Sequence, residues 1–354
     1  MVSAARLTVL GSLNMDISVT VPRLPAPGAT VLGGVAAYSP GGKGANQAVA
    51  AARLGAAVRM VGCVGDDEFG RSLQAALEAE AVGDDGVRTV PGVPTGLAMI
   101  TVDEAGENII TVAPGANREV GEAEIAAIGD LAADVLVISA EVPVAAIRAA
   151  LTTRGQVLRV LNLAPAPPEA AELVAAGVDW LVVNEPEAAA VLGRQVTGLA
   201  GAARAAADLA KAGARNAVVT AGAAGAAYRG ARDDAGGPDG GADRARVPGT
   251  RGGHRGRWRH VRGRARGSAR GWGPAARCGA CRRRGGRRGG HPAGHSGRDA
   301  ASRRCARRHR THLARASPLI LRVTWSMVRR PPSLGRNGPS TPFRPGIEGP
   351  PNGG

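Results

Sequence analysis

Gly41-Gly42-Lys43-Gly44-Ala45-Asn46-Gln47 is the stretch around which the rest of the chain is organised. Two adjacent glycines can take backbone conformations with positive φ and let a ligand approach the main chain closely. Lys43 places a cation beside them, and the amide of Asn46 can both donate and accept hydrogen bonds. The stretch therefore predicts a turn that holds a polar ligand against the backbone.

A helix is predicted directly after this turn. Ala45, Ala48, Val49 and Ala52 recur with the spacing of one helical face, and Gly55 follows as a candidate C-cap. The start of such a helix offers free N–H groups and the positive end of the helix dipole. The alternative is an alanine-rich core helix after a turn, and this stretch alone does not distinguish the two.

Charge divides the chain of 354 residues into two unlike parts. Residues 1–228 contain 15 Lys and Arg against 23 Asp and Glu, a net charge of −8. Residues 229–354 contain 30 against 6, a net charge of +24. The overall net charge of +16 therefore describes neither part, and the two need separate interpretations.

The sequence predicts a cytoplasmic protein. It has no run of 18 apolar residues that would form a membrane span, and its first residues lack the pattern of a secretion signal. Its four cysteines predict no disulfide framework, which suits a reducing compartment.

Two polar residues follow the first predicted strand. Residues 7–11, Leu-Thr-Val-Leu-Gly, form a short apolar run that ends at glycine, and Asn14 and Asp16 come directly after it. Ligands of open α/β sheets bind beyond the carboxyl ends of strands, and alternate residues of an extended segment point the same way. We therefore expect both side chains to face one ligand; the alternative for each is an Asx turn.

Short apolar runs alternate with helical stretches along the first part of the chain. The runs cover residues 59–65, 135–139, 157–161, 180–183 and 217–219, and residues 69–81 are predicted to be helical. This alternation favours an α/β fold with a mostly parallel, Rossmann-like sheet and helices on both faces. Polar residues just past these runs are expected to line one cleft: Glu141, Asn162, Asn184, Glu187 and Thr220.

A small accessory sheet is predicted beside the main one. Residues 17–21 and 33–38 are candidate strands, and residues 96–102 and 108–112 form a hairpin-like pair.

Seven motifs follow one another along residues 7 to about 228 without a large gap: Gly11-Ser12-Leu13-Asn14-Met15-Asp16, Gly41-Gly42-Lys43-Gly44-Ala45-Asn46-Gln47-Ala48, Gly65-Asp66-Asp67-Glu68-Phe69-Gly70, Gly106-Glu107-Asn108, Gly115-Ala116-Asn117, Asn184-Glu185-Pro186-Glu187 and Thr220-Ala221-Gly222. Taken together, they resemble ribokinases, in the larger family of sugar and nucleoside kinases with the ribokinase fold. The Lys-Gly-Ala-Asn-Gln run favours ribokinases over their relatives.

The resemblance implies ATP- and Mg²⁺-dependent phosphorylation of the 5-hydroxyl of D-ribose. It also implies a β lid, from about residues 17–40 and 96–113, that covers the sugar and often pairs two subunits into a homodimer. A pentose is a ring of hydroxyls, and recognising one needs converging donors and acceptors. The positions implied to bind the sugar are Asn14, Asp16, Gly41, Gly42, Lys43, Asn46 and Glu141.

The resemblance places the nucleotide at a second group of residues. Asn184, Thr220, Gly222 and Gly225 match positions near the ATP phosphates and at the start of the nucleotide loop. Glu187 matches a position near Mg²⁺ and would act on the metal or on its waters, because Mg²⁺ usually keeps several waters.

The second part of the chain departs from the family pattern. A ribokinase continues with Asp-Thr-x-Gly-Ala-Gly-Asp, whose last Asp is the general base and whose helix start stabilises the moving phosphoryl group. No such motif occurs after Tyr228, so the base, the anion hole, half of the adenine pocket and the family's K⁺ site are expected to be missing. The chain as written is therefore predicted to be inactive.

Three interpretations of residues 229–354 compete, and each starts from an irregular, low-complexity tail. The first is a disordered Arg/Gly segment that binds nucleic acid, and the second is a zinc site formed by Cys278 and Cys281 with later His or Cys residues. The third is translation in the wrong reading frame. Thirty arginines without a single lysine favour the third, so a nucleic-acid partner is not expected.

The frame hypothesis can be examined within the sequence. One permitted set of codons for residues 254–266, read one base later, encodes Thr-Gly-Ala-Gly-Gly-Asp-Thr-Phe-Val-Gly-Ala-Leu. This is close to the missing motif and lies at about the expected distance. The alternatives that remain are another sugar or nucleoside kinase of the same fold, and a non-catalytic sugar-binding or RNA-binding protein.

Overall fold

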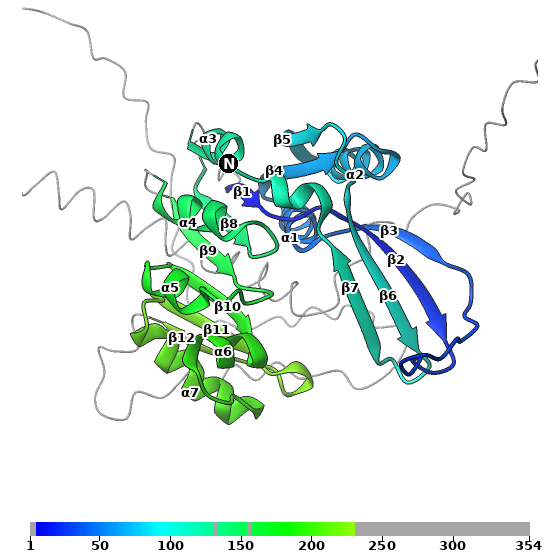
Figure 1. The fold of residues 1–354 in the computed structure, drawn as a ribbon. Coiled ribbons are helices and arrows are strands. Elements are labelled where there is room, and N and C mark those ends of the chain that lie inside the picture. The colour runs from blue at the N-terminus through cyan, green and yellow to red at the C-terminus, as the bar shows by residue number, and fades with distance from the viewer. Residues whose placement is uncertain (1–4, 130–132, 154–156, 231–354) are drawn as a thin grey trace, which may run out of the picture. The chain divides into compact units, whose positions relative to one another are not determined.

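The centre of the fold is a mixed sheet of eight strands in the order β12-β11-β10-β9-β8-β1-β4-β5, seen in a computed structural model that describes residues 5–129, 133–153 and 157–230 (Figure 1). Every pairing is parallel except β11 with β12, which confirms the mostly parallel sheet predicted from the sequence. The strands are β1 (Arg6–Leu10), β4 (Ala57–Gly65), β5 (Val82–Val90), β8 (Val135–Ser139), β9 (Leu158–Asn162), β10 (Trp180–Asn184), β11 (Asn216–Thr220) and β12 (Ala226–Gly230).

Helices cover both faces of this sheet, as expected. One hydrophobic cluster packs the later helices against Leu136, Ile138 and neighbouring strand residues, and the other packs α1 and α2 against Val9 and Val137. The helices are α1 (Lys43–Arg53), α2 (Glu68–Ala79), α3 (Glu122–Gly129), α4 (Val144–Thr152), α5 (Ala170–Ala175), α6 (Glu185–Leu192) and α7 (Gly198–Lys211), with short 3-10 turns η1 (Gly115–Glu119) and η2 (Gly222–Ala224).

On the face of the sheet that packs against α1 and α2, the helical covering changes from one end to the other. Over β9, β10 and β11 the buried residues of this face are Leu158, Val160, Trp180, Val182 and Val218, and Trp180 stacks on Tyr228 of β12 with ring centroids 5.6 Å apart. Among the described helices, only α1 and α2 contribute buried side chains to this cluster. This part of the sheet is therefore covered by no helix of the described residues.

Two glycines let α1 pack directly on the end of β1. A Cβ atom on Gly44 would lie 2.6 Å from the carbonyl carbon of Gly11, and one on Gly11 would lie 2.8 Å from Cα of Gly44. The main chains of Gly11 and Gly44 are therefore in direct contact, which holds the start of α1 against the end of β1.

We expect Gly44→Ala to lower the free energy of unfolding by about 3 kcal/mol, because a methyl group there overlaps main-chain atoms that cannot move aside. Gly129→Ala is the matched control, since no atom lies within 4 Å of a Cβ built at that helical position. Urea unfolding of both variants measures the difference. Equal midpoints would show that the β1–α1 contact is loose.

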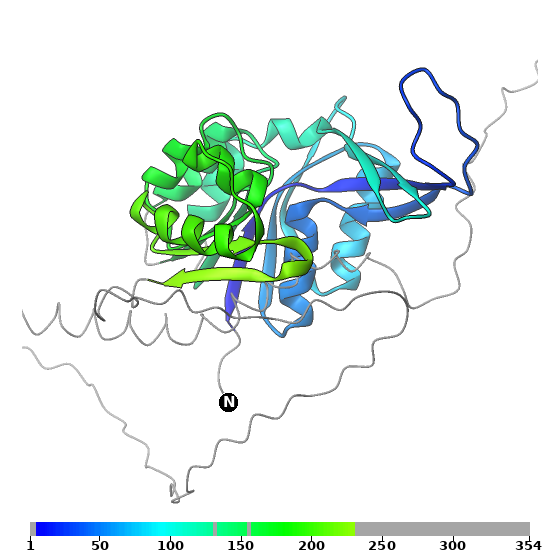
Figure 2. The same ribbon diagram turned by 90° about the horizontal axis from the view of Figure 1, so that it is seen from below.

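A second sheet of four strands forms the predicted accessory layer, with the order β3-β2-β6-β7. The strands β2 and β6 pair in parallel, and β6 and β7 form the expected antiparallel pair. Figures 1 and 2 show these strands leading away from the main sheet, with the loop between β2 and β3 at their far end. The strands are β2 (Asn14–Val21), β3 (Ala37–Gly41), β6 (Gly96–Asp103) and β7 (Asn108–Ala113). We call this sheet the lid.

Several strands differ from the prediction: β12 was not predicted, and β2 begins at Asn14 rather than at residue 17. β3 covers Ala37–Gly41 rather than residues 33–38, and it includes Pro40, which is tolerated because β3 is an edge strand. β5 was not predicted, because its Gly-Asp-Asp-Gly segment interrupts the apolar pattern. It is also an edge strand, in which exposed and buried residues are mixed.

The predicted irregular tail lies almost wholly outside the described residues, as do the zinc-site and Arg/Gly interpretations. Its first two residues, Arg229 and Gly230, belong to β12. No helix in the described ranges has the length and apolar character needed to cross a bilayer.

Candidate functional site

Five neighbouring strands place polar residues at the same edge of the main sheet. β11, β10, β9 and β8 end at or just before Thr220, Asn184, Asn162 and Glu141, and β1 leads into Asn14. With strands about 4.8 Å apart, this row extends roughly 19 Å, long enough for an elongated ligand.

A cavity of about 580 Å³ lies along this row and under the lid. It brings together most of the residues singled out from the sequence, and Gly41, Gly222 and Gly225 are the three that do not line it. Its lining comprises Asn14, Asp16, Gly42, Lys43, Asn46, Gln47, Ala98, Ile100, Val102, Asn108, Ile110, Val112, Glu141, Asn162, Ala164, Val182, Val183, Asn184, Glu187 and Thr220.

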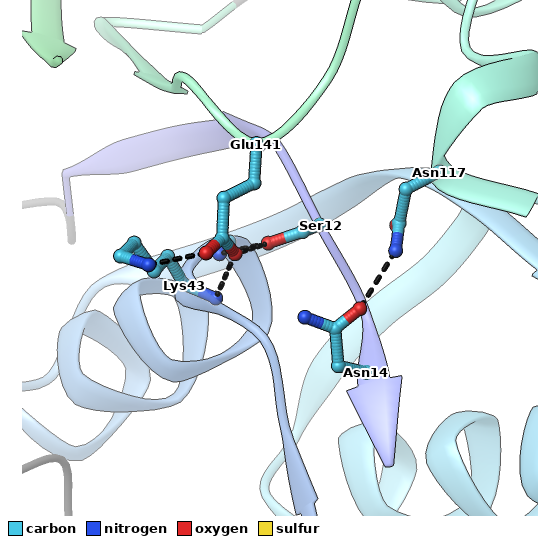
Figure 3. A network of polar contacts seen from close by, with 6 residues as sticks. Ser12, Asn14, Lys43, Asn117 and Glu141 are labelled. Carbon is cyan, nitrogen blue, oxygen red and sulfur yellow. Dashed lines mark hydrogen bonds and ion pairs between the residues drawn. The ribbon is translucent and has the colours of Figure 1, made fainter. Parts of the chain in front are cut away.

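Glu141 organises the cavity floor around the start of α1 (Figure 3). One carboxylate oxygen pairs with the Lys43 ammonium group. The other accepts hydrogen bonds from the Ser12 hydroxyl at 2.6 Å and from the Lys43 backbone N–H at 3.3 Å. A carboxylate at a helix N-terminus also interacts favourably with the helix dipole.

The prediction of free N–H groups at the start of α1 was therefore wrong. The Gly44 N–H donates to the Ser12 hydroxyl at 3.4 Å, and the Ala45 N–H donates to the Ser12 carbonyl at 3.0 Å. Because Glu141 and Ser12 already satisfy this helix start, a ligand meets side chains here rather than bare amides. The predicted C-cap of α1 is shifted by one residue: Leu54, not Gly55, is the C-cap, and Gly55 follows it with φ 90°.

Asn14 and Asp16 lie on β2, at the base of the lid, rather than in a turn after β1. Asn14 is buried, and its side-chain oxygen accepts a hydrogen bond from the Asn117 side-chain amide at 2.8 Å. Asp16 pairs across the sheet with Ser39, and Gly41 lies beside its carboxyl group, where any side chain would overlap it. Gly41 thus leaves space for the Asp16 side chain.

The Asp16 carboxyl group has a raised pKa of about 6. Burial is the largest cause, the nearby Glu141 carboxylate adds to it, and the Lys43 cation opposes it. Asp16 is therefore a strong hydrogen-bond acceptor above this pH and loses its charge below it.

Gly42 lets the turn close around the site. Its φ is 90°, and a Cβ atom there would lie 2.6 Å from the Ser12 carbonyl oxygen and 2.7 Å from the Asn14 nitrogen. Asn46 and Gln47 follow on α1, and within the described part of the chain their side-chain carbonyl oxygens are buried without a hydrogen-bond partner. Unpaired buried acceptors of this kind are costly unless a ligand satisfies them.

The other end of the cavity contains the residues implied to face the nucleotide. The Asn184 side chain accepts from the Glu187 N–H at 2.9 Å, and the Glu187 carboxylate accepts from the Asn184 N–H at 2.8 Å, a reciprocal cap of α6. Burial raises the pKa of Glu187, partly offset by this hydrogen bond. After Thr220, Gly222 begins the η2 turn and Gly225 is its C-cap, and both have positive φ.

The donor set fits Mg²⁺ only in the manner of a nucleotide-bound ion. In the described ranges, no group of three acidic, His or Cys side chains could hold a metal. Glu187 nevertheless lines the cavity and has a second carboxylate oxygen. One carboxylate, waters and phosphate oxygens suffice for Mg²⁺ in kinase sites.

Several residues of the site were missed in the sequence. Ser12, Gln47, Asn108 and Asn117 occur within the quoted motifs, but no periodicity distinguishes them from structural residues. Asn162 was noted only as one of a series of polar strand ends. Their roles depend on contacts with residues far away in sequence, such as the bond from Ser12 to Glu141.

Comparison with known families gives a match that spans all the described residues. Residues 4–239 match the family described as pfkB family carbohydrate kinase.

Two curated relatives are ribokinases. The Haemophilus influenzae ribokinase is 37% identical over 228 residues, covering 62% of this chain and 72% of that protein. The Schizosaccharomyces pombe ribokinase is 38% identical over 196 residues, covering 52% of this chain and 61% of that protein. The chain therefore matches only part of the length of each relative.

A solved structure of Arabidopsis thaliana ribokinase, complexed with ribose and ATP, superposes with a TM-score of 0.53 and 29% identity. The superposition covers 64% of this chain and 75% of that one.

Proposed function

Since this chain belongs to the pfkB family of carbohydrate kinases, we propose that its cavity binds D-ribose beside ATP, and that the ancestral reaction is transfer of the γ-phosphoryl group to the ribose 5-hydroxyl. The observation that carries the proposal is the convergence of Asn14, Asp16, Lys43, Asn46 and Glu141 on one cavity. Such a mixture of buried donors and acceptors suits a ring of hydroxyls.

The nucleotide would occupy the end of the cavity near Asn184 and Thr220. Its γ-phosphate would then face the sugar end, where Lys43 supplies a cation. Glu187 would hold Mg²⁺ directly or through water, and the ion would neutralise phosphate charge. The ribose- and ATP-bound Arabidopsis structure supports this pair of substrates.

We further propose that the tail is read out of frame and that this chain therefore binds sugar without turnover. The sequence after Tyr228 lacks the Gly-Ala-Gly-Asp motif. One face of β9, β10 and β11 is covered by no helix in the part of the chain that the structure describes. This supports the same view, because parallel sheets are normally covered on both faces. The nucleotide sequence of codons 226–270 tests this directly.

The lid is proposed to pair two subunits in the cytoplasm. Its outer strand β7 is exposed along its length, and the apolar residues Met99 and Ile109, which do not line the cavity, are about half exposed. Exposed apolar residues grouped on one sheet are typical of an association surface.

The test of the sugar site is a titration of the full-length chain with D-ribose, D-arabinose and adenosine. Saturable binding that is strongest for D-ribose is the expected result. Stronger binding of adenosine would identify a nucleoside site instead, and binding of none of the three would overturn the proposal.

Lys43→Ala is expected to weaken D-ribose binding about tenfold, because it removes one charged donor and releases the carboxylate of Glu141. Lys211→Ala is the matched control, since Lys211 pairs with Asp208 on α7 and does not line the cavity. Calorimetric titration gives both dissociation constants. An unchanged constant for Lys43→Ala would make Lys43 a surface lysine without a part in binding.

A further inference from the structure

Asn117 is a buried amide that lies behind the sugar cavity without lining it. It belongs to η1, the turn that follows the lid strand β7, and it is 1% exposed. Its amide group makes four hydrogen bonds, although no catalytic or binding role was assigned to it from the sequence.

The partners of Asn117 fix which way its amide points. Its oxygen accepts from the Leu13 N–H at 2.9 Å. Its nitrogen donates to the carbonyl oxygens of Leu13 and Pro114, each at 3.0 Å, and to the side-chain oxygen of Asn14 at 2.8 Å. A flipped amide would set its oxygen against three other oxygens, so only one orientation is compatible with these partners.

The orientation of Asn117 determines that of Asn14 in turn. Because the Asn14 oxygen accepts from Asn117, its NH₂ group lies on the side away from Asn117 (Figure 3). Gly96 makes room for this contact, since a Cβ atom there would overlap both amide groups. Asn14 lines the cavity beside Asp16 and Glu141, which are acceptors when ionised.

We propose that Asn117 is a positioning residue that makes Asn14 a hydrogen-bond donor toward the sugar. The inference rests on the proposed function of the cavity and deepens it. A sugar hydroxyl that donates to one of the carboxylates can then accept from the Asn14 NH₂ group. Asn117 thereby selects the direction of one hydrogen bond in the site without touching the ligand.

The experiment compares Asn14→Asp, Asn117→Asp and Asn117→Ala in the full-length chain. Asn14→Asp keeps the bond from Asn117 and replaces the donor toward the cavity by an acceptor. Asn117→Asp, with its new carboxyl group ionised, replaces the donor to Asn14 by an acceptor, which favours the opposite orientation of the Asn14 amide and has the same consequence. Each protein is titrated with D-ribose and with its 2-, 3- and 5-deoxy analogues.

In the wild-type chain, removing the hydroxyl that faces Asn14 is expected to weaken binding about tenfold. Asn14→Asp and Asn117→Asp are both expected to bind D-ribose at least about tenfold more weakly and to lose their dependence on that same hydroxyl. Asn117→Ala, which frees Asn14 to adopt either orientation, is expected to reduce this dependence.

Asn216→Ala is the matched control. Asn216 is also a buried amide with two hydrogen bonds, to the Asp179 carbonyl and from the Tyr228 hydroxyl, but it lies at the start of β11, away from the cavity. It is expected to lower stability and to leave the preference among the deoxy sugars unchanged.

Folded Asn117 variants that keep the wild-type preference among deoxy sugars would overturn the inference and leave the proposed function standing. If the Asn117 variants do not fold, side-chain amide NMR of the wild-type chain decides. The Asn14 NH₂ signals, assigned by their loss in Asn14→Asp, must move on addition of D-ribose, and unmoved signals overturn the inference. No pentose binding by the wild-type chain overturns the proposed function and the inference with it.

Discussion

The full-length chain is expected to show no ATP-dependent phosphorylation of D-ribose above background, whereas a chain returned to the neighbouring reading frame after residue 230 is expected to react at least about 10⁴-fold faster. A positioned general base contributes about 10²–10⁴-fold to such reactions, and donors that stabilise the transferred group contribute about 10²–10³-fold. The carboxylates of Glu141 and Glu187 cannot replace the base, because they already pair with Lys43 and cap α6.

A coupled assay of ADP release measures both chains, prepared in the same way. In the frame-restored chain, replacing the last Asp of the regained Gly-Ala-Gly-Gly-Asp motif by Asn should return the rate to background. Turnover by the unaltered chain that disappears in its Asp16→Ala variant would contradict the prediction, since a contaminating kinase would not respond to that change.

Asp16→Asn is expected to reduce D-ribose affinity at least about 100-fold at pH 8, because a charged acceptor is replaced by an amide that presents a donor or a weaker acceptor. Ionisation of Asp16 near pH 6 should also make wild-type affinity rise with pH through that value. The variant lacks the titrating group, so its affinity should be flat across the same range. Calorimetric titrations at pH 5, 6, 7 and 8 measure both trends.

The same substitution should stabilise the fold at high pH. A raised pKa in the folded state means that the stability contributed by neutral Asp16 is present below its ordinary value of 3.8 and is lost as pH rises through about 6. Solvent contact screens part of this cost. We therefore expect Asp16→Asn to melt about 2–4 °C above the wild-type chain at pH 8, and at the same temperature at pH 3, below both pKa values of Asp16. A lower melting temperature at pH 8 would show that the Asp16 charge is compensated within the fold.

The fold was largely predictable because its buried strands are short, continuous apolar runs. Val135–Ser139 is buried at every position, and a parallel strand covered on both faces needs that pattern. β5 escaped prediction because an edge strand has no such requirement, and its acidic segment resembles a loop. Pro40 is accommodated in β3 for a related reason, since an edge strand can lose a backbone donor.

The site was predictable where one residue type at a strand end was enough, as for Asn14, Glu141 and Thr220. Contacts between residues far apart in the sequence could not be predicted. The hydrogen bond between Asn117 and Asn14 joins residues 103 positions apart, and the bond from the Lys43 N–H to Glu141 spans 98. No local periodicity reports such pairs. The free helix start was mispredicted because its cap comes from a distant part of the chain.

The position of Asp16 has a mechanical consequence. Asp16 belongs to the lid strand β2, whereas Glu141 follows β8 of the main sheet. A sugar held by both carboxylates therefore links the two sheets for as long as it is bound. Its arrival should slow deuterium uptake by the amides of β6 and β7, although neither strand donates a charged group to it. Hydrogen exchange of the lid backbone then reports whether a sugar occupies the cavity.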